Sequence, residues 1–92
     1  MLTADQLDAE TCASLTTRLK TIEGQARGIQ RMLEEHRACP EILDQLAALR
    51  AASHAATMQA LEGFALHCLR ESSDEPEAMM EQLLSVISRV TR

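Results

Sequence analysis

The sequence predicts an all-α fold, built as a three-helix protomer in a single domain over residues 1–92. Ala (14) and Leu (13) supply most of the apolar residues, and both rank at the top of the helix-propensity scale. Phe64 is the only aromatic residue, so a sheet would lack the side chains that pack well on a pleated surface. Pro40 and Pro76 are the only prolines, and each lies in a break between helical segments.

The first predicted helix begins between Thr3 and Thr11, where Thr3 and Gln6 have the spacing of a capping box. Cys12 starts an apolar seam with alternating intervals of three and four residues, typical of a helix that packs on another. We interpret Cys12 as a small buried residue or as a third oxidisable thiol. The seam continues through Leu15, Leu19, Ile22, Ala26, Ile29 and Leu33.

A break at residues 37–40 precedes the second predicted helix, because proline disfavours helical geometry in the residue before it but suits the first turn. From Glu41 to about Leu69 the chain is rich in Ala, Leu and Met, lacks proline and has one glycine, Gly63. This pattern predicts a long helix. Its alanines allow close approach of neighbouring helices, so we expect it at the centre of a bundle.

A second break covers residues 71–77 and contains Ser, Asp, Glu and Pro, which favour the start of a helix. A short third helix follows. Its apolar stripe, enough to dock on a bundle, consists of Met80, Leu83, Ile87 and Val90.

Composition excludes several classes of protein. No apolar run approaches the roughly 18–20 residues of a membrane span, and the N-terminal residues are acidic where a signal peptide is basic. We therefore expect a cytoplasmic protein without a membrane partner, whose three cysteines are reduced. The chain has no Gly-rich phosphate loop and no nucleophile, base and orienting group, so we predict no enzyme. A small, Ala-rich chain buries little apolar surface, which favours self-association.

Charge is unevenly distributed along the chain, whose net charge is −5. Residues 18–31 hold four basic residues and one acid, whereas residues 71–81 hold five acids and no base. The first segment is an ordinary solvated face or a contact for nucleic-acid phosphates. On a helix its polar residues form two groups away from the seam: Lys20, Arg27 and Arg31 within about 40° of one another, and Arg18 with Gln25 on another flank.

Gly24 and Gly28 fall inside the first predicted helix, where each costs about 1 kcal/mol relative to alanine. Close approach of a partner helix or of a phosphate backbone would offset this cost.

Cys39 and Cys68 lie near opposite ends of the second predicted helix. Their separation of 29 residues corresponds to about 40–45 Å at the helical rise, so they cannot meet within one chain. In two protomers packed antiparallel about a two-fold axis, Cys39 of one chain lies beside Cys68 of the other. The helix N-terminus and Arg37 favour a thiolate at Cys39. Alternatively, the two cysteines are unrelated buried residues.

Three motifs resemble the CsoR/RcnR/FrmR family of small bacterial repressors. They are RLKTIEGQARGIQRM (18–32), CPEIL (39–43) and QLAALRAA (45–52), and the resemblance covers about residues 15–90. It implies a three-helix protomer, an antiparallel four-helix-bundle dimer and a dimer of dimers, a tetramer that binds operator double-stranded DNA without a helix-turn-helix. An inducer bound at the interprotomer cysteine then releases the DNA.

The resemblance also implies roles for individual residues. The DNA-binding set comprises Arg18, Lys20, Gln25, Arg27, Arg31 and Arg50. Copper-sensing members have a Cys, a His 25 residues later and a Cys four residues after that, and here these positions are Cys39, Phe64 and Cys68. Two surrounding positions, Tyr and Glu in the copper sensors, correspond to Ala38 and Gln82.

Two cysteines without the histidine look most like the persulfide-sensing, CstR-like members. The N-terminal histidines of nickel and cobalt sensors are absent, and Leu2 stands where formaldehyde sensors have proline. The resemblance implies that the Cys39 thiolate attacks a low-molecular-weight persulfide or polysulfide, without a cofactor. Cys68 of the neighbouring chain then forms a disulfide or sulfur-bridged cross-link. Phe64 withholds a metal ligand and keeps the pocket apolar.

The sequence is also compatible with two alternatives. The first is a Cu(I)-responsive repressor of the same fold, with the metal held by Cys39 and Cys68 from two chains and with His67 reaching in. The second is a helical protein-interaction module that does not bind DNA.

Overall fold

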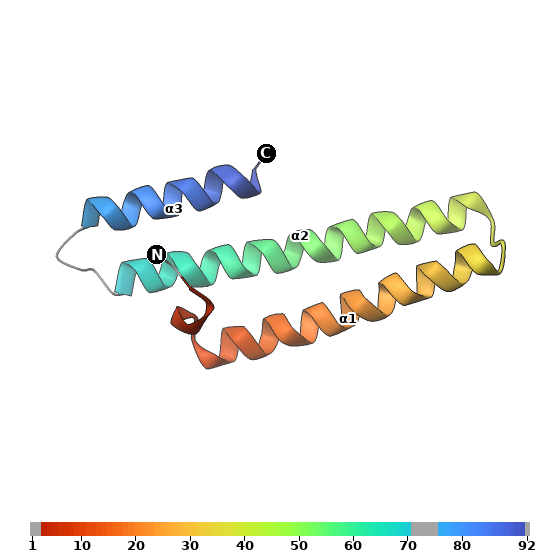
Figure 1. Cartoon of the computed structure of the whole chain (residues 1–92), viewed down its shortest axis with the longest axis horizontal. Helices are drawn as coiled ribbons and strands as arrows, with labels where there is room; N and C mark the ends of the chain where they lie inside the picture. Colours follow the sequence, from red (N-terminus) through yellow and green to blue (C-terminus); the bar gives the residue numbers. More distant parts are fainter. Residues whose placement is uncertain (1–2, 71–75, 92) are drawn as a thin grey trace.

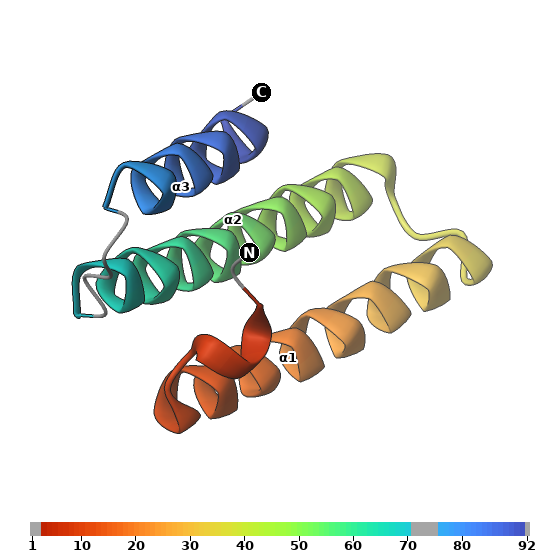
Figure 2. The same cartoon turned by 60° about the vertical axis from the view of Figure 1, so that its left-hand side comes forward.

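A computed structural model describes residues 3–70 and 76–91. The elements are a 3-10 turn η1 (Ala4–Gln6), α1 (Ala9–Glu34), α2 (Cys39–Arg70) and α3 (Pro76–Val90). Helices α1 and α2 form a long antiparallel hairpin, and α3 folds back along the C-terminal half of α2 on the side away from α1 (Figures 1 and 2). The described ranges contain no strand, as predicted, and α2 occupies the centre of the three helices.

The helix boundaries differ from the predicted ones by a few residues. Helix α2 begins at Cys39 rather than Glu41, because Pro40 fits the first helical turn, where its missing N–H removes no hydrogen bond. Helix α3 spans Pro76–Val90, in agreement with the third predicted segment. Residues 71–75, with most of the second predicted break and three of its acids, lie outside the described residues.

The N-terminus of α1 is capped by a residue that the sequence analysis did not select. The Asp8 carboxylate accepts a hydrogen bond from the Thr11 backbone N–H at 3.2 Å. Hydrogen bonds from the Thr11 side chain and backbone lower the pKa of Asp8. The predicted Thr3–Gln6 capping box is present, but it caps η1 instead of α1.

The turn between α1 and α2 is closed by hydrogen bonds within six residues. His36 has a positive φ of 56°, its N–H donates to the Leu33 carbonyl at 3.2 Å, and the Arg37 N–H donates to the Met32 carbonyl at 3.0 Å. This pattern is a Schellman motif, in which glycine is the usual residue with a positive φ.

The hairpin buries few side chains. Only Ile29 (6% exposed) and Ala56 (8%) are buried among the described residues, and the Gln59 side-chain amide donates to the Ser14 hydroxyl at 2.8 Å between the helices. Many large apolar side chains are exposed on all three helices: Leu19, Leu33, Leu43, Leu46, Met58, Leu66, Leu69, Met80, Leu84 and Val90. The protomer is long and thin, with extents of 58 × 27 × 14 Å.

No helix in the described parts of the chain combines the length and apolar character that a membrane span requires.

Candidate thiol site and nucleic-acid interface

The two thiols of the predicted site lie at opposite ends of α2. Cys39 is the first residue of the helix and is exposed, whereas Cys68 lies two residues before its end and is half-buried. Figure 1 shows the helix running between the two ends of the molecule. The rise of 1.5 Å per residue separates their backbones by about 44 Å. One protomer therefore cannot bring them together.

The surroundings of Cys39 are open and polar. The Arg37 guanidinium lies 2.9 Å from the Glu41 carboxylate, and its Nε donates to the same oxygen at 3.0 Å. Arg37, two residues before Cys39, is therefore paired with Glu41. Ala38, one of the predicted pocket residues, is exposed beside Cys39.

Cys68 lines an apolar cavity of about 180 Å³ between the end of α2 and the start of α3. The predicted pocket residue Phe64 is half-buried and lies four residues before Cys68, so it shares that helix face. Gln82 is half-buried on α3 and is not among the lining residues. The cavity is lined by Cys68, Leu69, Pro76, Met79, Met80 and Leu83.

His67 opens onto a different cavity. That space, about 170 Å³, lies between the C-terminal end of α2 and the segment that precedes α1, and Asp8, Gly63 and Arg70 also line it. The structure therefore does not gather Cys39, Cys68 and His67 within one protomer. Among the described residues, no three His, Cys, Asp or Glu side chains are placed to hold a metal ion.

Cys12 lies at the start of α1, half-buried beside η1. Its thiol is 3.7 Å from the Ala4 carbonyl oxygen, to which it donates a weak hydrogen bond. The half-buried position of Cys12 agrees with the prediction of a small packed residue. Oxidation of the Cys12 thiol stays a prediction.

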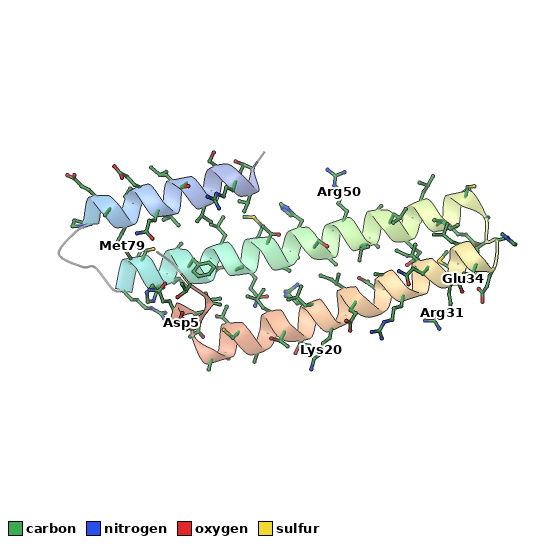
Figure 3. The ribbon with its side chains drawn as sticks, viewed as in Figure 1. Asp5, Lys20, Arg31, Glu34, Arg50 and Met79 are labelled. Carbon is green, nitrogen blue, oxygen red and sulfur yellow. The ribbon has the colours of Figure 1, made fainter. Side chains whose placement is uncertain are left out.

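The predicted DNA-binding residues do not share one face. Figure 3 shows that Lys20 and Arg31 leave α1 on the side away from α2, whereas Arg50 leaves α2 on the side away from α1. Arg18 and Arg27 are also exposed on α1. The outer side of α1 therefore carries the main basic surface, and Arg50 lies on the opposite long edge.

Two details modify that basic surface. The Arg27 guanidinium lies 3.6 Å from the Glu23 carboxylate one turn away, which offsets part of the positive charge. Gln25 is half-buried, and its side-chain oxygen is shielded from solvent without a hydrogen-bond partner among the described residues. A Cβ atom added at Gly24 or Gly28 would meet nothing within 4 Å, so no described part of the protomer approaches these glycines closely.

An open, mainly apolar groove of about 380 Å³ runs between α1 and α2. It combines the predicted seam of α1 with small residues of α2. Its lining residues are Leu15, Leu19, Ile22, Ser53, Ala56, Thr57 and Ala60.

Residue spacing did not connect Met79 and Met80 with Cys68. Met80 was assigned to the stripe that docks α3, and Met79 was assigned nothing. Contact between α2 and α3 is tertiary, so no spacing along the chain encodes it. The only available signal was the pair of adjacent methionines in a helix predicted to pack on the bundle.

A family profile and two relatives that match this chain are described as transcriptional repressors. The profile of a family described as "Metal-sensitive transcriptional repressor" matches residues 12–89. The chain is 41% identical over 80 residues to the copper-sensing transcriptional repressor CsoR of Bacillus subtilis (strain 168), covering 85% of this chain and 79% of that protein. It is 33% identical over 76 residues to the transcriptional repressor RcnR of Salmonella typhimurium, covering 83% and 82%.

Two solved structures have the same fold. The copper-sensing repressor CsoR with Cu(I) from Geobacillus thermodenitrificans NG80-2 matches with a TM-score of 0.80 and 38% identity, over 100% of this chain and 95% of that one. The nickel-responsive transcriptional regulator InrS matches with a TM-score of 0.79 and 31% identity, over 85% and 90%. The all-helical, three-helix prediction is confirmed.

Proposed function

The chain belongs to the family of metal-sensitive transcriptional repressors, and on that premise we propose that it represses transcription by binding operator double-stranded DNA. Residues 1–92 act as one CsoR-like domain that both binds DNA and senses the inducer. The DNA is released when Cys39 of one protomer is cross-linked to Cys68 of its neighbour by reactive sulfur species, as in CstR-like members. The observation that carries this proposal is the pair of thiols with Phe64, instead of an imidazole, on the face of Cys68.

Self-association is supported by the amount of exposed surface. The protomer exposes 7020 Å², whereas a compact protein of its 10.2 kDa mass exposes about 5,300 Å². The groove between α1 and α2 and the exposed leucines supply apolar surface for a second protomer. Antiparallel packing about a two-fold axis covers this groove and places Cys39 beside the partner's Cys68. Two such dimers form the proposed tetramer.

DNA binding is assigned to the basic outer side of α1. Lys20, Arg27 and Arg31 contact phosphates there, Arg18 contacts them from the other flank of α1, and repetition in a tetramer multiplies the local charge. Gln25, half-buried on the flank of α1 that carries Arg18, supplies a side-chain amide. Arg50 lies on the opposite long edge of the protomer. It therefore contacts the same DNA only when it belongs to another protomer of the tetramer.

The DNA assignment is tested by substitutions that each remove one positive charge. Lys20→Gln or Arg31→Gln lowers operator affinity and reduces the slope of log affinity against log salt by about 1 for each phosphate interaction removed. Arg89→Gln, an exposed charge on α3, is the matched control and leaves the slope unchanged. Equal effects of all three substitutions would exclude the α1 surface as the DNA interface.

The proposed switch transfers sulfur and then forms a disulfide. The Cys39 thiolate attacks the terminal sulfur of a persulfide RSSH, which forms Cys39–S–SH and releases the thiolate RS⁻. The partner's Cys68 thiolate then attacks the sulfur bonded to the Cys39 side chain, forms the disulfide and expels hydrosulfide. In total, two thiols and RSSH give one disulfide, RSH and H₂S. If both cysteines are persulfidated first, closure gives a trisulfide and H₂S. No cofactor takes part.

A second candidate inducer is Cu(I), which the similarity to copper-sensing repressors favours. Two thiolates are soft ligands that suit this ion. The family's third position is an apolar ring, Phe64, and His67 opens onto another cavity. The residues present therefore do not complete a three-ligand set in that arrangement, and the sulfur switch is the better chemical fit.

The test is mass spectrometry under denaturing, non-reducing conditions after anaerobic treatment with glutathione persulfide, with operator binding measured in parallel. The proposal predicts linked dimers at twice the chain mass, with increments of about 32 Da for retained sulfur, and loss of operator binding. Cys39→Ser and Cys68→Ser abolish both effects but still bind operator, while Cys12→Ser responds normally. A chain mass that is unchanged after treatment with glutathione persulfide, together with operator release by Cu(I), would favour the second candidate.

A further inference from the structure

We propose that Cys68, Met79 and Met80 form a Cu(I) site within a single protomer, separate from the cross-link between protomers. The site goes beyond the proposed function because it requires neither Cys39 nor a second chain.

The three sulfur-bearing side chains meet at one cavity. They provide half of the six residues that line the space of about 180 Å³ between α2 and α3. Cys68 and Met79 are half-buried, and Met80, 54% exposed, lies at the rim. Figure 3 shows Met79 directed from α3 toward the C-terminal end of α2. Residues that carry a thiol and two thioethers therefore line one cavity from two helices.

The chemistry of the cavity selects a soft, monovalent ion. Thiolate and thioether sulfurs are preferred ligands of Cu(I), whereas divalent nickel, cobalt and zinc favour sites that include nitrogen or oxygen. The other lining side chains, Leu69, Pro76 and Leu83, offer neither. One thiolate neutralises the single charge of Cu(I), and a neutral complex suits apolar surroundings in which a net charge is costly.

Binding at this site involves no change of oxidation state. The Cys68 thiol gives its proton to solvent as the copper–sulfur bond forms, the two thioethers donate lone pairs, and copper stays Cu(I). The bound ion is then coordinated by the Cys68 sulfur atom, which the proposed cross-link also requires. Cu(I) therefore slows the cross-linking reaction at Cys68.

Affinity measurements separate this site from one shared between protomers. Cu(I) is titrated anaerobically against a chromophoric Cu(I) chelator, without DNA or persulfide. Cys39→Ser keeps the wild-type affinity within about threefold. The double variant Met79→Leu/Met80→Leu loses at least about tenfold, because loss of a residue that only orients a metal ligand already costs about 10–100-fold. Met58→Leu, at an exposed methionine on α2, is the matched control. Wild-type affinity in the double variant, or loss of binding in Cys39→Ser, would overturn the proposal.

Spectroscopy tests the ligands directly. In selenomethionine-labelled protein loaded with one Cu(I) per chain, copper X-ray absorption shows selenium as a neighbour of copper. The signal disappears in labelled Met79→Leu/Met80→Leu and persists in labelled Cys39→Ser. Sulfur scattering without selenium would reject the methionine ligands. Because these assays contain no persulfide and no DNA, failure of the cross-linking switch leaves their outcome unaffected.

Discussion

The two ends of the α1–α2 hairpin are organised by different kinds of interaction. At the turn, hydrogen bonds join residues fewer than six positions apart, and Arg37 pairs with Glu41 one helical turn later. At the open end, Gly63 lies against Leu7, and Cys68 of α2 and Met79 of α3 line one cavity. Turn substitutions should therefore change the stability of the whole hairpin. Open-end substitutions should release the segments docked there.

The largest expected effect is at Ile29, in the half of α1 that leads to the turn. Ile29→Ala removes a buried side chain and lowers the free energy of unfolding by about 2–4 kcal/mol. Urea denaturation at fixed protein concentration measures the change. Gln30→Ala, at an exposed polar position on the same helix, is the control and costs less than half as much. Equal costs would show that Ile29 does not belong to the packed interior.

The next effect is at Gly63, at the open end. A Cβ atom at Gly63 would lie 2.8 Å from Leu7 Cδ2 and 3.2 Å from Thr11 Cγ2. Gly63→Leu overpacks this contact, a change that typically costs about 1–3 kcal/mol, and detaches the segment before α1. Faster amide hydrogen exchange in η1 and the first turn of α1 reports the change. Glu62→Leu, exposed on the same helix, leaves exchange in η1 unaltered.

A smaller effect of opposite sign is expected at His36. His36→Gly removes the steric cost of a positive φ and raises the free energy of unfolding by about 1 kcal/mol. Thermal unfolding measures the gain. His36→Ala keeps the strain and gives no gain, and a stabilised His36→Ala variant would show that the imidazole, not the backbone, sets the cost.

The smallest effect concerns the dependence of stability on pH. Because hydrogen bonds from Thr11 hold the pKa of Asp8 below its usual value of 3.8, its contribution is fully present above that pH. The contribution is lost as the pH falls through the lower, folded-state pKa. Asp8→Asn keeps a capping side chain and flattens the stability profile below pH 3.8. An unchanged acid profile would exclude Asp8 as its source.

Local sequence patterns predicted most of the fold. The apolar seam and the two prolines were enough to place three helices, and the Ala-rich segment was correctly placed in the middle. Capping was harder to assign, because Thr3 and Gln6 carried a valid capping box for a short turn while Asp8 capped the helix. Both motifs provide side-chain acceptors for backbone N–H groups at the start of a helix. Only the observed backbone shows that one caps η1 and the other caps α1.

The candidate site was less predictable because its parts come from different helices. The separation of Cys39 and Cys68 followed from helix length alone. Gln25 was grouped with Arg18 by helical angle, yet the hairpin half-buries it, and Arg50 lies on the opposite edge from Lys20. The methionines beside Cys68 depend on how α3 docks, which has no signature in residue spacing.

The scarcity of buried side chains has a consequence for the amount of repressor in a cell. In the proposed tetramer, a hairpin whose described interior consists of Ile29 and Ala56 draws much of its folding free energy from contact with other copies, so folding and assembly form one equilibrium. Dilution then unfolds the chain instead of merely separating its subunits. On the proposed assembly, the number of repressor molecules per cell has a threshold, below which the protein is lost to proteolysis and the operator is left unoccupied without any inducer.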